Sequence, residues 1–195
     1  MHRAFKPFFQ TAPLAQRQPR LSQYIKAVKK HSLEETVQVV WQGILSKWFP
    51  FRQGYKWGIK GSTLSNNNMP DATVIQVCAL RPNPSDSEDW AERQILLIEC
   101  KRPSKDTPLG WDDTITGQFT DDLSATLNAS GRLFGAVAIG TKVRFYQWDG
   151  QVLPDGELCQ LHPGTFDLAT NDGIQEVENM MNFIKARGWE WAAPK

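Results

Sequence analysis

An apolar run that ends in charged residues constrains this chain more than any other feature. Residues 93–101 read RQILLIECK, and the segment ILLIEC has the composition of a strand that is buried on both faces. Such a strand belongs in the interior of a sheet covered by helices, because an edge position would leave its apolar residues in water. The sequence therefore predicts an α/β fold built around this strand.

The other expected elements alternate along the chain in an order that suits such a sheet. Some segments carry apolar residues at helical spacing, and others have the composition of strands. The α-β-β-β-α-β-β order with a C-terminal helix predicts a mixed central sheet flanked by helices. In chain order the elements are a helix at 32–49, strands at 54–63, 71–80 and 93–101, a helix at 111–131, strands at 132–140 and 142–151, and a helix at 172–188.

Local signals set the ends of the expected helices. Ser32 followed by Glu35 is the pattern of a capping box, and Pro50 ends the first helix. In the second helix Leu127 continues the apolar stripe, and Gly131 predicts the end. The residues expected to face inward in the last helix are Ile174, Val177, Met181 and Ile184.

Length and charge separate a basic arm from one folded domain. The chain has 195 residues, enough for one domain with a substantial core. Residues 1–33 hold seven Lys or Arg and no acid, so the net charge of +1 leaves −6 on the rest of the chain. We expect residues 1–31 to form a basic N-terminal arm that contains a short helix, and residues 32–195 to form a single domain. Such an arm either contacts phosphates or is simply solvated.

Composition also bears on the class of protein. The chain has no apolar segment of about 18 residues, so no membrane span is expected. The three cysteines form no CxxC pattern and do not cluster with the three histidines, which predicts reduced cysteines and no zinc site. The start of the chain lacks the apolar core of a secretory signal. An intracellular protein of the cytoplasm or nucleus is therefore expected, with an organellar transit peptide left open.

Charged residues at the ends of two strands indicate a metal site. Side chains alternate along a strand, so Glu99 and Lys101 point to the same face. If the strands at 71–80 and 93–101 pair, Asp71 approaches both, and two carboxylates share a small volume with one ammonium. Mg²⁺, for which Mn²⁺ can substitute, takes hard oxygen ligands of this kind together with water and phosphate oxygens. The alternative is a strand-end salt bridge beside an unrelated turn acid.

The same residues carry a resemblance to a known family. Pro70–Asp71 and the Glu99-Cys100-Lys101 triplet resemble the PD-(D/E)xK nuclease superfamily, whose restriction-endonuclease-like core has the element order expected over residues 32–149. The later segments FGAVAIG and KVRFYQW are similar to strands of the N-terminal nuclease domains of type I restriction subunits. The resemblance implies Asp71, Glu99 and the Cys100 carbonyl as metal ligands, and Lys101 as the residue that positions or activates water.

Two further site residues are candidates through this resemblance. Many family members add an acid from the first helix. At about 100° per residue, Glu34 falls on the apolar side of that helix and Glu35 falls nearly opposite. Glu34 is therefore the candidate, and a first-turn acid favoured by the helix dipole is the alternative. Some relatives carry a Gln and, four residues later, a Tyr; here Gln118 occupies the first position, but Asp122 stands at the second and argues against that subgroup.

The function predicted from these residues is Mg²⁺-dependent hydrolysis of phosphodiester bonds in DNA, or less readily in RNA. Water would attack in line and leave a 5′-phosphate, as the resemblance implies. Cleavage of both DNA strands often needs two copies, so a homodimer is left open. Two other functions stay open: a nuclease fold that binds nucleic acid or protein without turnover, and a toxin or effector nuclease. The candidate contacts to nucleic acid are Lys29, Lys30, Arg102 and Lys105.

Overall fold

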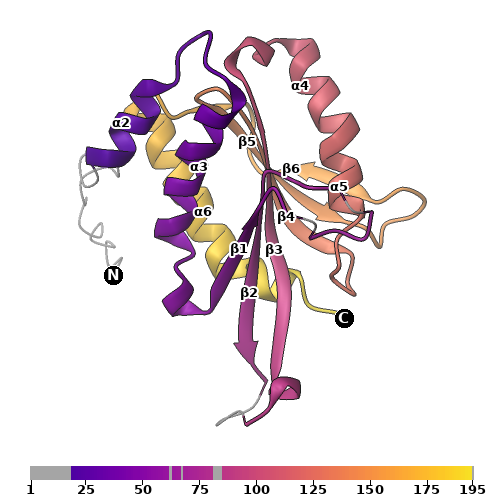
Figure 1. Cartoon of the computed structure of the whole chain (residues 1–195). Helices are drawn as coiled ribbons and strands as arrows, with labels where there is room; N and C mark the ends of the chain where they lie inside the picture. Colours follow the sequence, from indigo (N-terminus) through magenta and orange to yellow (C-terminus); the bar gives the residue numbers. More distant parts are fainter. Residues whose placement is uncertain (1–18, 62, 67, 81–84, 195) are drawn as a thin grey trace, which may run out of the picture.

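The architecture is one mixed sheet with helices on both faces (Figure 1). The structure, a computed structural model, describes residues 19–61, 63–66, 68–80 and 85–194. The first 18 residues of the predicted basic arm therefore lie outside the described residues. The short helix expected within the arm is α2 (Pro19–Ala27), and its Leu21 and Ile25 are buried in the core.

Within the described residues, seven strands form the sheet. They lie in the order β1-β2-β3-β4-β5-β6, and a short β7 pairs with β5 on the same edge as β6. β3 and β4 run parallel, whereas all other pairs are antiparallel. The strands are β1 (Tyr55–Ile59), β2 (Ala72–Ala79), β3 (Trp90–Lys101), β4 (Arg132–Ile139), β5 (Lys142–Asp149), β6 (Glu157–Gln160) and β7 (Phe166–Asp167).

The helices form a layer on each face of the sheet (Figure 1). One face is covered by α2, α3 (Glu34–Trp48) and α6 (Asn171–Trp191). The other is covered by α4 (Pro108–Thr114) and α5 (Thr120–Ser124), which are joined by one turn of π-helix at Ile115–Phe119. The predicted mixed sheet flanked by helices, with a C-terminal helix, is thus confirmed. Short 3₁₀ turns lie at Phe51–Gln53, Ser87–Asp89 and Pro103–Lys105.

β3 lies inside the sheet, as its apolar run predicts. β2 pairs with one side of it and β4 with the other, and all residues from 94 to 100 are buried. Ile98 and Cys100 pack in the layer under α3 and α6, whereas Leu97 packs in the layer under α4 and α5. Because side chains alternate, Glu99 and Lys101 share the face of Leu97.

The first long helix starts differently from its prediction. α3 begins at Glu34, and its N-cap residue makes no side-chain capping bond, so the predicted capping box of Ser32 and Glu35 is wrong. The Ser32 hydroxyl instead accepts a hydrogen bond from the Lys29 backbone N at 2.8 Å and donates to the Ala27 carbonyl at 3.4 Å. Since α2 ends at Ala27, the Ser32 side chain hydrogen-bonds backbone groups at the end of α2 and does not cap the start of α3.

The second predicted helix is broken and shorter than its apolar stripe. It starts at Pro108 rather than at residue 111, because the Thr107 hydroxyl accepts a hydrogen bond from the Gly110 backbone N at 3.0 Å and caps it. The π turn follows, and within it Gly117 has non-helical backbone angles. The last helical residue is Ser124.

After α5 the chain leaves the helix because its polar groups bind β3. The Thr126 hydroxyl and the Leu127 backbone N both donate to Gln94 Oε1, and Asn128 Nδ2 donates to the Gln94 carbonyl. Leu127 is consequently 63% exposed, and Gly131 adopts φ +63° in the turn before β4. The predictions that Leu127 faces inward and that Gly131 ends the helix are therefore wrong.

The C-terminal region combines a confirmed helix with two missed strands. α6 covers the predicted span and extends to Trp191. β6 is mostly exposed and β7 has two residues, so neither shows the alternation by which a strand is recognised. The inward residues of α6 are confirmed as buried: Ile174, Val177, Met181 and Ile184.

Candidate active site

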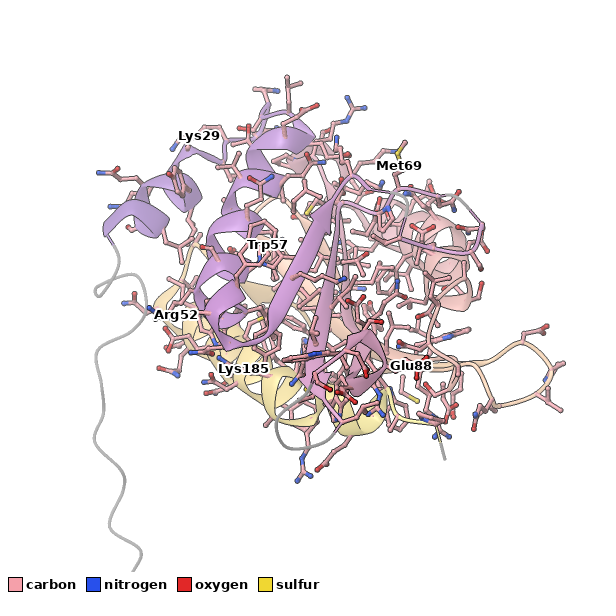
Figure 2. The ribbon with its side chains drawn as sticks, turned by 60° about the horizontal axis from the view of Figure 1, so that its bottom comes forward. Lys29, Arg52, Trp57, Met69, Glu88 and Lys185 are labelled. Atoms are coloured by element: carbon pink, nitrogen blue, oxygen red, sulfur yellow. The ribbon has the colours of Figure 1, made fainter. Side chains whose placement is uncertain are left out.

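The start of β2 and the end of β3 meet at one end of the sheet. β2 runs antiparallel to β3, and its first residue, Ala72, pairs with Ile98. The next residues outward, Asp71 and Glu99, therefore lie side by side at the end of this ladder. Met69, two residues before Asp71, lies at this end of the molecule in Figure 2, and Lys185 lies toward the other.

Asp71 joins β2 to both β3 and α3. Its Oδ2 accepts a hydrogen bond from the Cys100 backbone N at 2.7 Å, and its Oδ1 accepts one from Gln38 Nε2 at 2.5 Å. The residue is 7% exposed. Burial raises the pKa of Asp71, and the hydrogen bond from Cys100 opposes that rise without cancelling it. The carboxylate is thus fixed by two elements before any ligand binds.

Glu99 and Lys101 form an ion pair on the face predicted from strand alternation. Lys101 Nζ lies 2.5 Å from Glu99 Oε1, and the Glu99 side chain is 2% exposed. Burial raises the pKa of Glu99 to about 7, and the hydrogen bond from Lys101 only partly offsets it. Among the described residues, Glu99 Oε2 has no hydrogen-bond partner. The pair is the strand-end salt bridge of the alternative prediction, and it is largely buried on an interior strand; the metal site stays a prediction.

Lys101 has a second contact on the helical layer. Its Nζ donates to Gln118 Oε1 at 3.2 Å, and Gln118 lies in the π turn between α4 and α5. Burial acts to lower the pKa of Lys101, but the hydrogen bond and charge of Glu99, with the charges of Glu34 and Asp71, raise it overall. The raised pKa keeps Lys101 protonated, so that it donates hydrogen bonds to Glu99 and Gln118.

Glu34 is the acid of α3 that lies near this group. Gln38 Nε2, which binds Asp71, lies 3.5 Å from Glu34 Oε1. The charge of Glu34 also raises the pKa of Asp71 and of Lys101. Glu35 is exposed. The helix geometry that distinguished the two acids thus agrees with the structure, and the role of Glu34 as a metal ligand stays a prediction.

Two site residues escaped the sequence reasoning. Gln38 is buried on α3 and bridges two carboxylates, and its sequence signal was a polar residue one turn after Glu34 on the apolar face. Asp122 is fully buried on α5, accepts a hydrogen bond from Asn68 and lies near Gln118, whose side chain lowers its pKa. In the sequence it stands where some relatives have a Tyr, and it was not among the predicted site residues. Its signal was the four-residue spacing from Gln118, which places two polar side chains on one flank of a helix.

The four residues expected to contact nucleic acid are all exposed. Lys29 and Lys30 lie in the turn between α2 and α3, and Arg102 and Lys105 directly follow β3. Because α3 begins at Glu34 and β3 ends at Lys101, both segments adjoin the site. The predicted contacts stay predictions, with the side chains accessible to a ligand.

The direction of the Cys100 carbonyl follows from its neighbours. In an extended strand the N–H and C=O of one residue point to the same edge, and successive residues alternate between edges. The Cys100 N–H points to Asp71 at the β2 edge, whereas the Lys101 carbonyl accepts from the Gly140 backbone N at 3.0 Å beside β4. The Cys100 carbonyl therefore points toward Asp71, which is the direction that its predicted role requires.

The donor atoms fit a cation site that has few protein ligands. In the described part of the chain, no three Asp, Glu, His or Cys side chains are grouped as a metal-binding cluster. Mg²⁺ commonly uses only one or two carboxylates and completes its shell with water and substrate oxygens. Glu99 Oε2 is a buried oxygen without a donor, and a bound cation would satisfy it. Asp71 can accept further bonds, because a carboxylate offers about four acceptor sites.

Comparison of the chain with protein-family models, with curated proteins and with solved structures finds no match. Among the helices in the described ranges, none is both long enough and apolar enough to cross a membrane. The function must therefore be argued from the chemistry of the site.

Proposed function

We propose that this protein is a metal-dependent nuclease of the PD-(D/E)xK type with a restriction-endonuclease-like core. The observation that carries the proposal is the contact of Asp71 with the backbone of Cys100, the residue between Glu99 and Lys101. It brings two carboxylates and an ammonium from two strands to one point. The order α3-β1-β2-β3-α4-α5-β4-β5, with β4 parallel to β3, supports the core assignment.

The roles of the side chains follow from their chemistry. Asp71, Glu99 and the Cys100 carbonyl would hold the cation, with Glu34 as a further candidate through Gln38. A bound Mg²⁺ would supply positive charge at the phosphate and act as a Lewis acid. The raised pKa of Lys101 makes it a donor that orients the attacking water or stabilises a phosphate oxygen as it gains charge.

The reaction would be hydrolysis at phosphorus. Water attacks in line with the 3′ oxygen, the bond from phosphorus to that oxygen breaks, and a 5′-phosphate results. The attacking water loses a proton, and the departing 3′ oxygen gains one. DNA is the proposed substrate ahead of RNA, and the exposed Lys29, Lys30, Arg102 and Lys105 would bind its phosphates.

The test is nicking of supercoiled plasmid DNA by the full chain with Mg²⁺ or Mn²⁺. We expect nicking by the wild type, loss of nicking on addition of EDTA, and a rate at least about 100-fold lower for Lys101→Ala. Lys56→Ala is the matched control, because Lys56 forms its 2.5 Å ion pair on the surface with Glu92. A wild type that is inert on DNA and RNA, or a fully active Lys101→Ala protein, would contradict the proposal.

A binding module without turnover is the second candidate, and one feature of the site favours it. Both oxygens of Asp71 already accept hydrogen bonds, and Lys101 already neutralises Glu99. These contacts satisfy the charges without a cation. The binding module predicts DNA retention in a gel-shift assay by wild type and Lys101→Ala alike, with no product from either protein.

A further inference from the structure

Asp122 is a carboxylate that the mechanism above does not use. It lies in α5 and is 0% exposed. A carboxylate in this position carries a desolvation cost, and burial accordingly raises the pKa of Asp122. Among the described residues its Oδ2 has no hydrogen-bond partner. A neutral side chain would fill the same space at lower cost, so the charge calls for an explanation.

Two amide side chains meet this carboxylate. Asn68 Nδ2 donates to Asp122 Oδ1 at 2.7 Å. The Gln118 side chain lies close enough to the carboxyl group to lower the pKa of Asp122, which opposes part of the rise caused by burial. Asn68 lies three residues before Asp71, in the loop that leads into β2. A second tie holds this loop to the end of α5, since the Ser65 hydroxyl and backbone N both bond the Ala125 carbonyl.

The contact with Gln118 has a definite polarity. An ionised carboxylate only accepts hydrogen bonds, so Gln118 must present its amide nitrogen to Asp122. Its Oε1 is then left for the Lys101 ammonium, which donates to it at 3.2 Å. If the Gln118 amide were turned over, its NH₂ group would face an ammonium and its oxygen would face a carboxylate, and both contacts would be repulsive.

We infer that Asp122 is a positioning residue that fixes the orientation of the Gln118 amide and, through its oxygen, the direction of the Lys101 ammonium. This inference deepens the proposed nuclease function and rests on it for the effect on catalysis. Asn68 holds the carboxylate in place from the other side. The chain Asn68, Asp122, Gln118, Lys101, Glu99 thus links the loop before Asp71 to the ion pair of β3.

A purely structural role for Asp122 makes a different prediction. If the carboxylate only tied α5 to the loop through Asn68, its replacement would lower stability and leave the chemical step alone. A positioning role predicts a lower rate, whereas stability is kept or raised because Asp122→Asn removes a buried charge with nearly the same shape. The exposed neighbour Asp121 on the same helix provides a matched control, Asp121→Asn.

The kinetic test compares these variants in single-turnover plasmid nicking with saturating Mg²⁺. We expect Asp122→Asn to lower the nicking rate about 10- to 100-fold with little change in the DNA concentration for half-maximal rate, and Asp121→Asn to match the wild type. The midpoint of thermal unfolding should not fall in Asp122→Asn. In a Gln118→Ala background, Asp122→Asn should have no further effect, because the two residues act in series.

A second readout does not depend on activity. The side-chain amide resonance of Gln118 in the ¹⁵N NMR spectrum, assigned by its loss in Gln118→Ala, should shift in Asp122→Asn and keep its position in Asp121→Asn. An unchanged Gln118 resonance in Asp122→Asn would overturn the inference whatever the activity. So would a reduced thermal midpoint with an unchanged rate, or fully additive effects of the two substitutions.

The two readouts separate the failure of each proposal. If the wild type nicks no DNA but the Gln118 resonance moves as expected, the nuclease function fails and the positioning of Gln118 by Asp122 stands. If the wild type is active and neither rate nor resonance responds to Asp122→Asn, the nuclease function stands and the inference fails.

Discussion

Asp71 and Glu99 are both buried acids, but their surroundings set them apart. Asp71 accepts hydrogen bonds at both oxygens, from Gln38 and from the Cys100 backbone. Glu99 has one oxygen paired with Lys101 and the other without a partner among the described residues. At the residue scale, therefore, removal of a hydrogen-bond donor should change the stability of the protein through Asp71. A change of pH should change it through Glu99.

Replacement of Gln38 should destabilise the protein through Asp71. In Gln38→Ala the buried Asp71 Oδ1 loses its donor, so the free energy of unfolding should fall by about 1–3 kcal/mol. Urea denaturation measures the change. Gln42→Ala, one turn further along α3, is the control and should change the free energy by less than about 0.5 kcal/mol. Equal losses in the two variants would show that the contact with Asp71 contributes nothing specific.

The raised pKa of Glu99 should make stability fall as pH rises in the absence of metal. The folded protein holds the Glu99 proton up to a pKa of about 7, whereas the unfolded chain releases it near 4.5. Its contribution is complete below pH 4.5 and is lost as pH rises through 7, an effect of about 3 kcal/mol. The raised pKa values of Asp71 and Asp122 act in the same direction.

The measurement is urea unfolding in EDTA across this pH window. Glu99→Gln should flatten the profile, because the amide does not titrate. A wild-type profile that is flat or rises between pH 4.5 and 7 would contradict the pKa assigned to Glu99.

At the scale of elements, close approach of the helical layers to the sheet depends on glycine. A Cβ at Gly135 of β4 would collide with the Phe119 ring and lie 3.2 Å from Leu123 Cδ2. Phe119 and Leu123 are both fully buried, so neither has room to move. Phe119 directly follows Gln118. The packing of the π turn against β4 therefore determines where the Gln118 side chain lies.

Gly135→Ala should therefore weaken both fold and site. We expect the free energy of unfolding to fall by about 1–3 kcal/mol from overpacking, with a lower nicking rate as the π turn shifts. Gly43→Ala in α3 is the control, because its Cβ would meet Leu21 Cδ1 at an ordinary 3.4 Å. That control should gain about 0.5–1 kcal/mol. Unchanged stability of Gly135→Ala in urea would disprove the close contact.

Element ends were the least predictable part of the fold. The Ser32–Glu35 spacing matched a capping box, yet Ser32 bonds α2, because a hydroxyl takes whichever backbone group lies in reach. Leu127 continued an apolar period, but its backbone N bonds Gln94 of another element. Both errors have one cause: a local pattern does not report competing hydrogen bonds, which come from the end of the preceding helix at Ser32 and from a distant strand at Leu127.

At the scale of the whole molecule, the site and the predicted phosphate contacts share one end. Ile59 of β1 pairs with Ala72 at the site end, whereas Tyr55 pairs with Gln76 at the far end, where Lys185 lies over the Tyr55 ring. Figure 2 shows Lys29 and Lys185 toward opposite ends. The affinity for nucleic acid bound at the site should therefore depend on the basic residues at this end of the molecule and not on those at the other.

The salt dependence of DNA binding tests which basic residues contact the phosphates. For a duplex measured by fluorescence anisotropy in EDTA, each lost phosphate contact should weaken binding and reduce the slope of log K against log salt by about 1. We expect this for alanine substitutions at Lys29, Lys30, Arg102 and Lys105, and no change for Lys185→Ala. The same slope in all five variants would remove these residues from the proposed interface.

The sequence alone determined those features of the protein that depend on the regular spacing of side chains along a strand or a helix. The apolar run at 95–100 required an interior strand, and the two-residue period put Glu99 and Lys101 on one face. The helical period likewise placed Glu34, and not Glu35, near the site. These inferences succeed because a period is a local property of the backbone.

Only the tertiary structure decided which side chains complete the site. Gln38 reaches Asp71 because α3 packs across the end of β2, and Asp122 meets Asn68 because the loop before β2 folds onto α5. Neither pairing has a periodic signal, because each joins elements that are distant in sequence. The charge state of Glu99 belongs here too, because its pKa of about 7 is set by burial, which the packing of the whole fold creates.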